Sequence, residues 1–129
     1  MNIPANLKYT KSDEWVRVEG TAATAGLTDY AQNALSDIVY VELPPVGEAI
    51  GKGEKFGSVE SVKAASDVYL PIGGTITAAN ETLSTAPEKV NSDPYGEAWM
   101  VKFTVANPAE LSDLMDAAAY EKYCAERAH

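Results

Sequence analysis

Strict alternation of apolar and polar residues marks one segment of this sequence as a half-buried β-strand. In residues 99–105, Met100, Lys102 and Thr104 separate large apolar side chains at Trp99, Val101, Phe103 and Val105. Successive side chains of a strand point to opposite faces, so this period predicts a sheet with one face on a core. Other short strand-like runs lie between Gly and Pro turns, at residues 15–18, 22–27, 38–43, 55–62, 66–72 and 75–78. The chain is therefore predicted to be mainly β, as a small sandwich or barrel.

Helical spacing is predicted early in the chain, in a short segment that begins at Asp29. Asp29 is the expected N-cap, Gln32 three residues later completes a capping box, and Ser36 and Asp37 end the helix. A single helical turn is also possible at residues 87–90, inside an otherwise polar segment.

Residues 108–127 are predicted to form a C-terminal helical extension. Asn107 is the expected N-cap of its first helix, and Asp116 is the expected N-cap of its second. On the second helix, Cys124 recurs with tyrosines at helical spacing, so we expect it to be a small core residue rather than a reactive thiol. His129, the last residue, is expected to lie in a frayed end.

Length and charge limit the classes of function. The 129 residues suit one domain, 1–129, with a core of its own. The net charge of −9 argues against binding to nucleic acid or to anionic membranes. The sequence has no apolar run of about 18 residues and no apolar leader segment, so we expect neither a membrane span nor secretion.

The sequence also lacks the usual residues of metal or nucleophilic catalysis. With one cysteine and one histidine, it offers neither an intrachain disulfide nor the four ligands of a structural zinc site. A reducing compartment is consistent with this content. We therefore expect a protein that is no enzyme, and whose chemistry depends on an attached group.

Lys63 is the residue most suited to carry such a group. It lies in the short connection between the predicted strands 55–62 and 66–72, at the protruding tip of a hairpin. Its neighbours Val62 and Ala64 are small and uncharged, so a modifying enzyme can dock there without burying a charge. On composition alone, Lys63 is an ordinary solvated surface lysine.

The surrounding sequence, Val59-Glu60-Ser61-Val62-Lys63-Ala64, resembles the lipoyl-lysine motif of the glycine cleavage system H proteins. The resemblance covers nearly the whole chain and includes residues 9–16, 26–32, 37–44 and 90–99. It implies the barrel-sandwich hybrid fold shared by lipoyl and biotinyl domains, with a short helix in the N-terminal half and helices at the C-terminus. Biotin carriers usually place methionines beside the lysine, and the lipoyl domains of 2-oxo acid dehydrogenases usually have Asp-Lys-Ala and lack both helical additions.

The resemblance implies a non-catalytic carrier with lipoate attached covalently to Lys63. A carrier of this family takes the aminomethyl group of glycine from a pyridoxal-phosphate-dependent decarboxylase and passes it to a folate-dependent aminomethyltransferase. Dihydrolipoyl dehydrogenase then reoxidises the carrier, and a lipoate ligase or octanoyltransferase modifies it in the first place. We expect a cytoplasmic monomer, or a mitochondrial-matrix protein if a transit peptide has been removed.

The resemblance also assigns roles to residues outside the hairpin tip. Gly47, Glu60 and Asp67 are implied in recognition by the lipoylating enzyme, and Ser12, Glu14 and Asp67 are implied in a pocket for the loaded arm. The pocket is implied by the resemblance and not by the spacing of these residues. Without the resemblance, Glu60 is a solvated strand carboxylate and Glu14 is a solvated residue before a strand.

Two departures from the family pattern and three alternative functions remain open. The family commonly has His where this chain has Asp13, beside the implied pocket, and Gly where it has Ser36, at a predicted helix C-cap. A lipoyl relay that hands its group to other proteins is one alternative. An H-like homologue that is no longer coupled to glycine is another, and an outright enzyme is the most distant.

Overall fold

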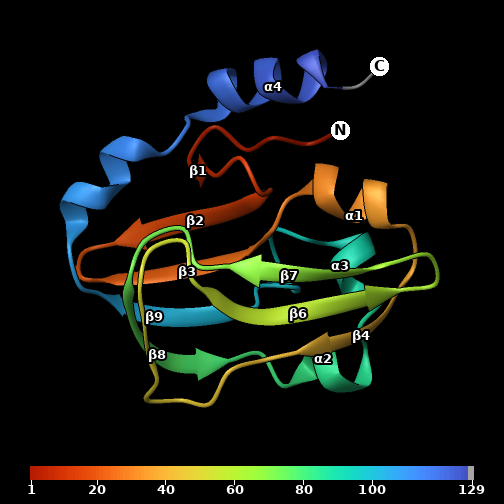
Figure 1. Cartoon of the computed structure of the whole chain (residues 1–129), viewed down its shortest axis with the longest axis horizontal. Coiled ribbons are helices and arrows are strands. Elements are labelled where there is room, and N and C mark those ends of the chain that lie inside the picture. Colours follow the sequence, from red (N-terminus) through yellow and green to blue (C-terminus); the bar gives the residue numbers. More distant parts are fainter. Residues whose placement is uncertain (128–129) are drawn as a thin grey trace.

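Two open antiparallel sheets form the body of the molecule (Figure 1). The computed structural model describes residues 1–127. The larger sheet has the strand order β1-β2-β3-β9-β8-β5, with β1 Lys8–Tyr9, β2 Glu14–Glu19, β3 Ala22–Leu27, β9 Val101–Val105, β8 Gly74–Ala79 and β5 Ala49–Ile50. The smaller sheet has the order β4-β6-β7, with β4 Ile38–Glu42, β6 Lys55–Ser61 and β7 Ala65–Tyr69. The expected mainly β sandwich is confirmed, and neither sheet closes into a barrel.

Helices occupy the connections and the C-terminal end. They are α1 Asp29–Leu35, α2 Thr82–Thr85, α3 Lys89–Ser92, the 3₁₀ helix η1 Pro108–Asp113 and α4 Ala117–Glu126. A helical turn was expected at residues 87–90, and helix α3 lies there but begins two residues later. Helix α2 was not predicted. The expected helix after Asn107 is a 3₁₀ helix, although Asn107 does cap it by accepting the Ala109 N–H at 3.2 Å. Asp116 caps α4 as expected, through the Ala119 N–H at 2.8 Å.

The predicted capping box of α1 was wrong by one residue. Thr28 is the N-cap, and its side chain accepts the Ala31 N–H at 3.2 Å. Asp29 is the first helical residue, where its carboxylate accepts a hydrogen bond from the Gln32 side chain at 2.6 Å. Thr28 takes the capping position because it is fully buried beside α4, which holds its hydroxyl near the helix end.

The alternation predicted for residues 99–105 holds within β9 but not before it. Val101 and Phe103 are buried and Lys102 and Thr104 are exposed. Met100, expected on the polar face, is fully buried. Its N–H bonds the Ala25 carbonyl ahead of the regular ladder, so the chain enters the sheet before the alternation begins.

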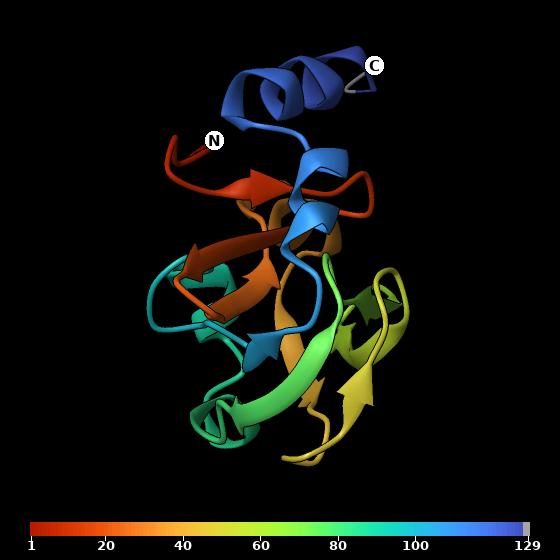
Figure 2. The ribbon, with the colours of Figure 1, turned by 90° about the vertical axis from the view of Figure 1, so that its left-hand side faces the viewer.

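Two groups of buried side chains stabilise this arrangement. The main core takes residues from both sheets, among them Ala25, Val59, Val68 and Phe103. The second group lies under α4, at the end of the molecule seen at the top of Figure 2, and consists of Leu7, Tyr9, Trp15, Tyr120 and Cys124. Cys124 is thus a core residue, as expected. The expectation for His129 lies outside the described residues.

Candidate functional site

Lys63 lies at the tip of the β6–β7 hairpin, as predicted, and is exposed. Ser61 builds the turn: its N–H bonds the Ala64 carbonyl at 2.7 Å. The Ser61 hydroxyl accepts the N–H groups of Lys63 at 3.2 Å and Ala64 at 3.0 Å. The tip is therefore an ordered turn that presents a reachable amine, rather than a loose loop.

The hairpin tip is also attached to the end of α1. The Val62 N–H bonds the Asp37 carbonyl at 3.0 Å, while the Val62 side chain is 70% exposed. The Lys63 ammonium donates to the Ala34 carbonyl at 3.1 Å. Both contacts place the lysine beside the α1–β4 connection, with an exposed apolar neighbour at its side.

The residues implied in enzyme recognition are spread over the smaller sheet and the loop between β4 and β5. Glu60 is exposed on β6, opposite Ala65 and Tyr40. Gly47 has φ 96°, and its N–H bonds the Ile76 carbonyl of β8 at 2.7 Å. Gly47 follows the end of β4 that is away from the hairpin tip, so the structure does not bring it to Lys63.

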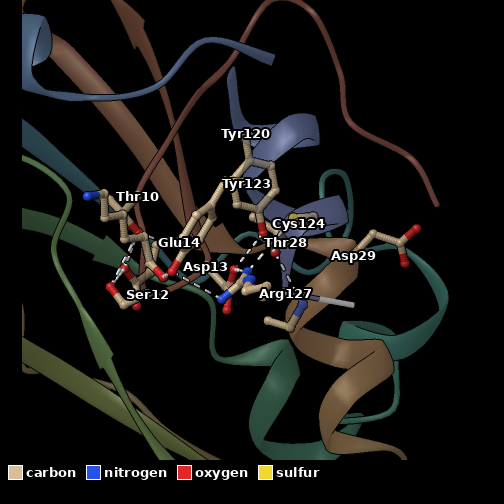
Figure 3. Close-up of polar contacts among 12 residues, drawn as sticks. Thr10, Ser12, Asp13, Glu14, Thr28, Asp29, Tyr120, Tyr123, Cys124 and Arg127 are labelled. Atoms are coloured by element: carbon tan, nitrogen blue, oxygen red, sulfur yellow. Dashed lines mark hydrogen bonds and ion pairs between the residues drawn. The ribbon is translucent and has the colours of Figure 1, made fainter. Parts of the chain in front are cut away.

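A cavity of about 230 Å³ lies at the other end of β7, with Glu14 in its wall. Its lining residues are Tyr9, Thr10, Lys11, Ser12, Glu14, Lys52, Gly53, Tyr69, Leu70, Pro71, Asp113, Leu114 and Met115. Thr10 and Ser12 each donate a hydroxyl hydrogen bond to Glu14 Oε1 at 2.6 Å (Figure 3). The main-chain N–H of Tyr69 donates to Glu14 Oε2 at 3.2 Å.

Glu14 is a buried carboxyl whose charge is sensitive to its surroundings. The side chain is fully buried, whereas without the family resemblance Glu14 reads as a solvated residue before a strand. Burial raises the pKa of Glu14 to about 7, against the opposing effect of the Ser12, Thr10 and Tyr69 hydrogen bonds. Near neutral pH, a cation that enters this cavity therefore meets a carboxyl that can ionise to pair with it.

Asp67 does not line this cavity. It forms an ion pair with Lys55 at 3.2 Å, and its side chain is half-exposed. Asp67 and Tyr69 lie on the same face of β7, because strand side chains alternate and the intervening Val68 is buried. Asp67 therefore lies between Lys63 and the cavity, along the outer face of the strand, and not beside Glu14 in the cavity wall.

Sequence reasoning missed a polar network that joins α4 to the segment before Glu14 (Figure 3). The Tyr120 hydroxyl donates to Asp13 Oδ1 at 2.7 Å and lies 2.7 Å from the Thr28 hydroxyl. Arg127 forms an ion pair with the same Asp13 carboxylate. The helical spacing of Tyr120, Tyr123 and Cys124 predicted that they share one helix face. No sequence signal paired the tyrosines with a loop more than a hundred residues earlier.

No helix among residues 1–127 is long and apolar enough to cross a membrane. Within the same residues, no three His, Cys, Asp or Glu side chains are grouped so that they could hold a metal ion.

Comparisons with known sequences and structures all match this chain to the same family, over nearly its full length. The sequence model described as glycine cleavage H-protein matches residues 7–127. The chain is 56% identical to the glycine cleavage system H protein of Koribacter versatilis, over 99% of this chain and 98% of that protein. It is 57% identical to the H protein of Laribacter hongkongensis, over 94% and 96% of the two chains. The crystal structure of the H protein from Mycobacterium marinum superposes with a TM-score of 0.82 at 32% identity, covering 98% of this chain and 100% of that one. The chain therefore belongs to the glycine cleavage H-protein family.

Proposed function

We propose that this protein is the lipoyl carrier of a glycine cleavage system, with lipoate bound as an amide to Lys63. The observation that carries the proposal is that one strand, β7, connects the exposed lysine to the cavity that contains Glu14. An exposed lysine precedes β7, and Tyr69, the last residue of β7, bonds the buried Glu14 carboxyl in a cavity wall. Between the turn that carries Lys63 and the Glu14 cavity, the five residues of β7 span about 13 Å.

The residues at both ends suit this group and its cargo. Lys63 is exposed between the uncharged Val62 and Ala64, which suits docking of a lipoate ligase or octanoyltransferase. Bound lipoate supplies a disulfide that accepts the aminomethyl group of glycine and is later reoxidised. The cargo carries an amine, and an ammonium ion is complementary to the Glu14 carboxylate and its two hydroxyl neighbours.

This chain contributes location and protection rather than catalysis. Lys63 presents the arm in turn to glycine decarboxylase, to the aminomethyltransferase and to dihydrolipoyl dehydrogenase, as a substrate of each. Thr10, Ser12 and Glu14 hold the cargo's ammonium group away from water between these visits. Asp67, on the outer face of β7, serves the lipoylating enzyme and the path of the arm. Membership of a family with bacterial relatives supports a cytoplasmic location.

A reconstituted reaction with matched lysine variants tests the proposal. Lys63→Arg keeps the positive charge but cannot form the stable amide, so we expect normal folding, no lipoate in the intact mass and no glycine cleavage. Lys55→Arg is the control, because Lys55 is an exposed lysine on the same hairpin. Peptide mass mapping that places lipoate on Lys55 or Lys52 would contradict the assignment. Lipoylated protein that accepts no aminomethyl group from glycine would instead favour the relay or the uncoupled homologue.

A further inference from the structure

The C-terminal helix contacts the segment that forms the wall of the Glu14 cavity at several points. The Tyr123 hydroxyl donates to the Lys11 carbonyl at 2.9 Å. The Tyr120 hydroxyl donates to the Asp13 carboxylate at 2.7 Å, and Arg127 pairs with that carboxylate. Two hydroxyls and one guanidinium from α4 and the residue after it thus hold the main chain and a side chain of residues 11–13.

This segment needs external support. Asp13 has φ 72°, a left-handed conformation that is unfavourable for residues other than glycine, and aspartate tolerates it only moderately. That turn returns the chain so that the Thr10 N–H bonds the Glu14 carbonyl at 3.0 Å and the Thr10 and Ser12 hydroxyls reach Glu14 Oε1. If Asp13 relaxed, the two hydroxyls would no longer converge on the carboxyl.

The contacts from α4 are themselves rigid. The Arg127 guanidinium lies over the rings of Tyr30 and Tyr123, at 4.0 and 4.2 Å from their centres. The Tyr120 ring stacks on Tyr9 with centres 4.6 Å apart and planes 6° apart. Tyr9 also pairs with Met115 through two main-chain hydrogen bonds, of 2.8 and 2.9 Å. Stacked rings and a planar, fixed cation leave these donors little freedom to move.

We propose that Tyr120, Tyr123 and Arg127 are positioning residues, which hold residues 10–13 in the conformation that points the Thr10 and Ser12 hydroxyls at Glu14. This role rests on the proposed use of the cavity for the aminomethyl arm. It assigns the C-terminal extension a function in retaining the cargo, beyond covering the buried group formed by Leu7, Tyr9, Trp15, Tyr120 and Cys124. Asp13, the residue that pairs with Arg127, directly precedes Glu14 in the chain.

The test removes the two tyrosine hydroxyls and keeps both rings. The double variant Tyr120→Phe/Tyr123→Phe loses the bonds to Asp13, Thr28 and Lys11 and the bond that Arg127 donates to the Tyr123 hydroxyl. It retains the ring contacts with Tyr9 and Arg127. Tyr95→Phe is the matched control: its hydroxyl donates to the Asn2 carbonyl and accepts the Asp29 N–H, and it makes no hydrogen bond with residues 10–14. If the double variant does not fold, Tyr123→Phe alone, whose ring is half-buried, takes its place.

The first measurement uses the unlipoylated protein and does not depend on the proposed function. Hydrogen exchange of the Tyr69 N–H reports its bond to Glu14, and carbon NMR of the Glu14 carboxyl reports its titration. The double variant should exchange the Tyr69 N–H roughly three- to tenfold faster, the factor for one ordinary hydrogen bond. The pKa of Glu14 should also rise further, because the hydrogen bonds from the Ser12 and Thr10 hydroxyls, which lower this pKa, are weakened once residues 10–13 are no longer held. Wild-type values for both in the double variant would overturn the positioning role.

The second measurement follows loss of the aminomethyl group to water from the loaded, lipoylated protein, with no transferase present. We expect faster loss in the double variant by roughly three- to tenfold, with Tyr95→Phe like wild type. Equal acceleration in Tyr95→Phe would mean a general loss of stability and would overturn the proposal.

The variant Glu14→Gln separates the positioning role of α4 from the proposed function of the cavity. If it accelerates loss and the double variant does not, the positioning role fails and the cavity's function stands. If Glu14→Gln has no effect, the cavity's proposed function fails. Hydrogen exchange of the Tyr69 N–H then decides by itself whether α4 positions residues 10–13.

Discussion

The carboxyl group of Glu14 accepts a hydrogen bond from the main-chain N–H of Tyr69 at 3.2 Å, across 55 residues of sequence. This bond joins the first residue of β2 to the last residue of β7, and so connects the larger sheet to the hairpin that carries Lys63. It places a buried acid at the end of the same strand that begins beside the exposed lysine.

Glu14→Gln should stabilise the protein at alkaline pH relative to acidic pH. Burial raises the pKa of Glu14 from 4.5 to about 7 in the folded protein. The folded state therefore binds more protons than the unfolded state between these values, and the free energy of unfolding falls as pH rises. Glutamine has no proton to lose, so the difference in unfolding free energy, variant minus wild type, should grow by about 3 kcal/mol from pH 4 to pH 8.

Urea denaturation of both proteins across this pH range measures that difference. Glu121→Gln, at an exposed position of α4, is the matched control for replacing a carboxyl group with an amide. A difference for Glu14→Gln that does not change with pH would mean that Glu14 ionises normally in the folded protein.

Ser36→Gly should raise stability. Ser36 ends α1 with φ 69° and ψ −155°, a region that is essentially limited to glycine. Its main-chain groups bond the Gln32 carbonyl and the Asn91 side chain, and glycine preserves both bonds. Removing the side chain should therefore stabilise the fold by about 1 kcal/mol, visible as a higher melting temperature. Ser36→Ala, which keeps Cβ, should show no such gain, and an equal gain in both variants would refute the backbone explanation.

Asp67→Asn should separate lipoylation from retention of the cargo. Asp67 pairs with Lys55 on the outer face of β7 and does not line the Glu14 cavity. We expect slower modification of Lys63 by a lipoate ligase, measured by intact mass over time, and loss of the aminomethyl group within about twofold of wild type, since its surface ion pair contributes little. Loss as fast as in Glu14→Gln protein would mean that Asp67 contacts the docked cargo directly.

Lipoylation itself should leave the stability of the fold nearly unchanged. Conversion of the Lys63 ammonium to an amide removes the charge from its hydrogen bond to the Ala34 carbonyl, but that bond is exposed. Thermal or urea unfolding of the modified and unmodified forms should therefore differ by less than about 1 kcal/mol. A difference above about 2 kcal/mol would show that the unloaded arm packs on the protein.

The sequence predicted most of the strands, the hairpin and the exposed lysine at its tip, because each rests on local chemistry, whereas the two-residue strands β1 and β5 were not predicted. Alternation placed β9, and turn residues placed the breaks around β2, β3 and β6. Lys63 followed from a short connection between two strand-like runs, and its exposure was confirmed. Even the cap at Asp116 was predictable, since a side chain and an N–H three residues away decide it.

Only the tertiary structure decided the cavity, because its members come from distant parts of the chain. Burial of Glu14 depends on Tyr69 and on a loop turned at Asp13, and nothing in the local pattern around Glu14 predicted a buried acid. The same holds for the cap of α1, which passed from Asp29 to Thr28 because Tyr120 lies beside the Thr28 hydroxyl. Sequence periodicity reports which face of an element is apolar. Which polar groups meet across the molecule depends on how the sheets and α4 pack, and that packing sets the pKa of Glu14.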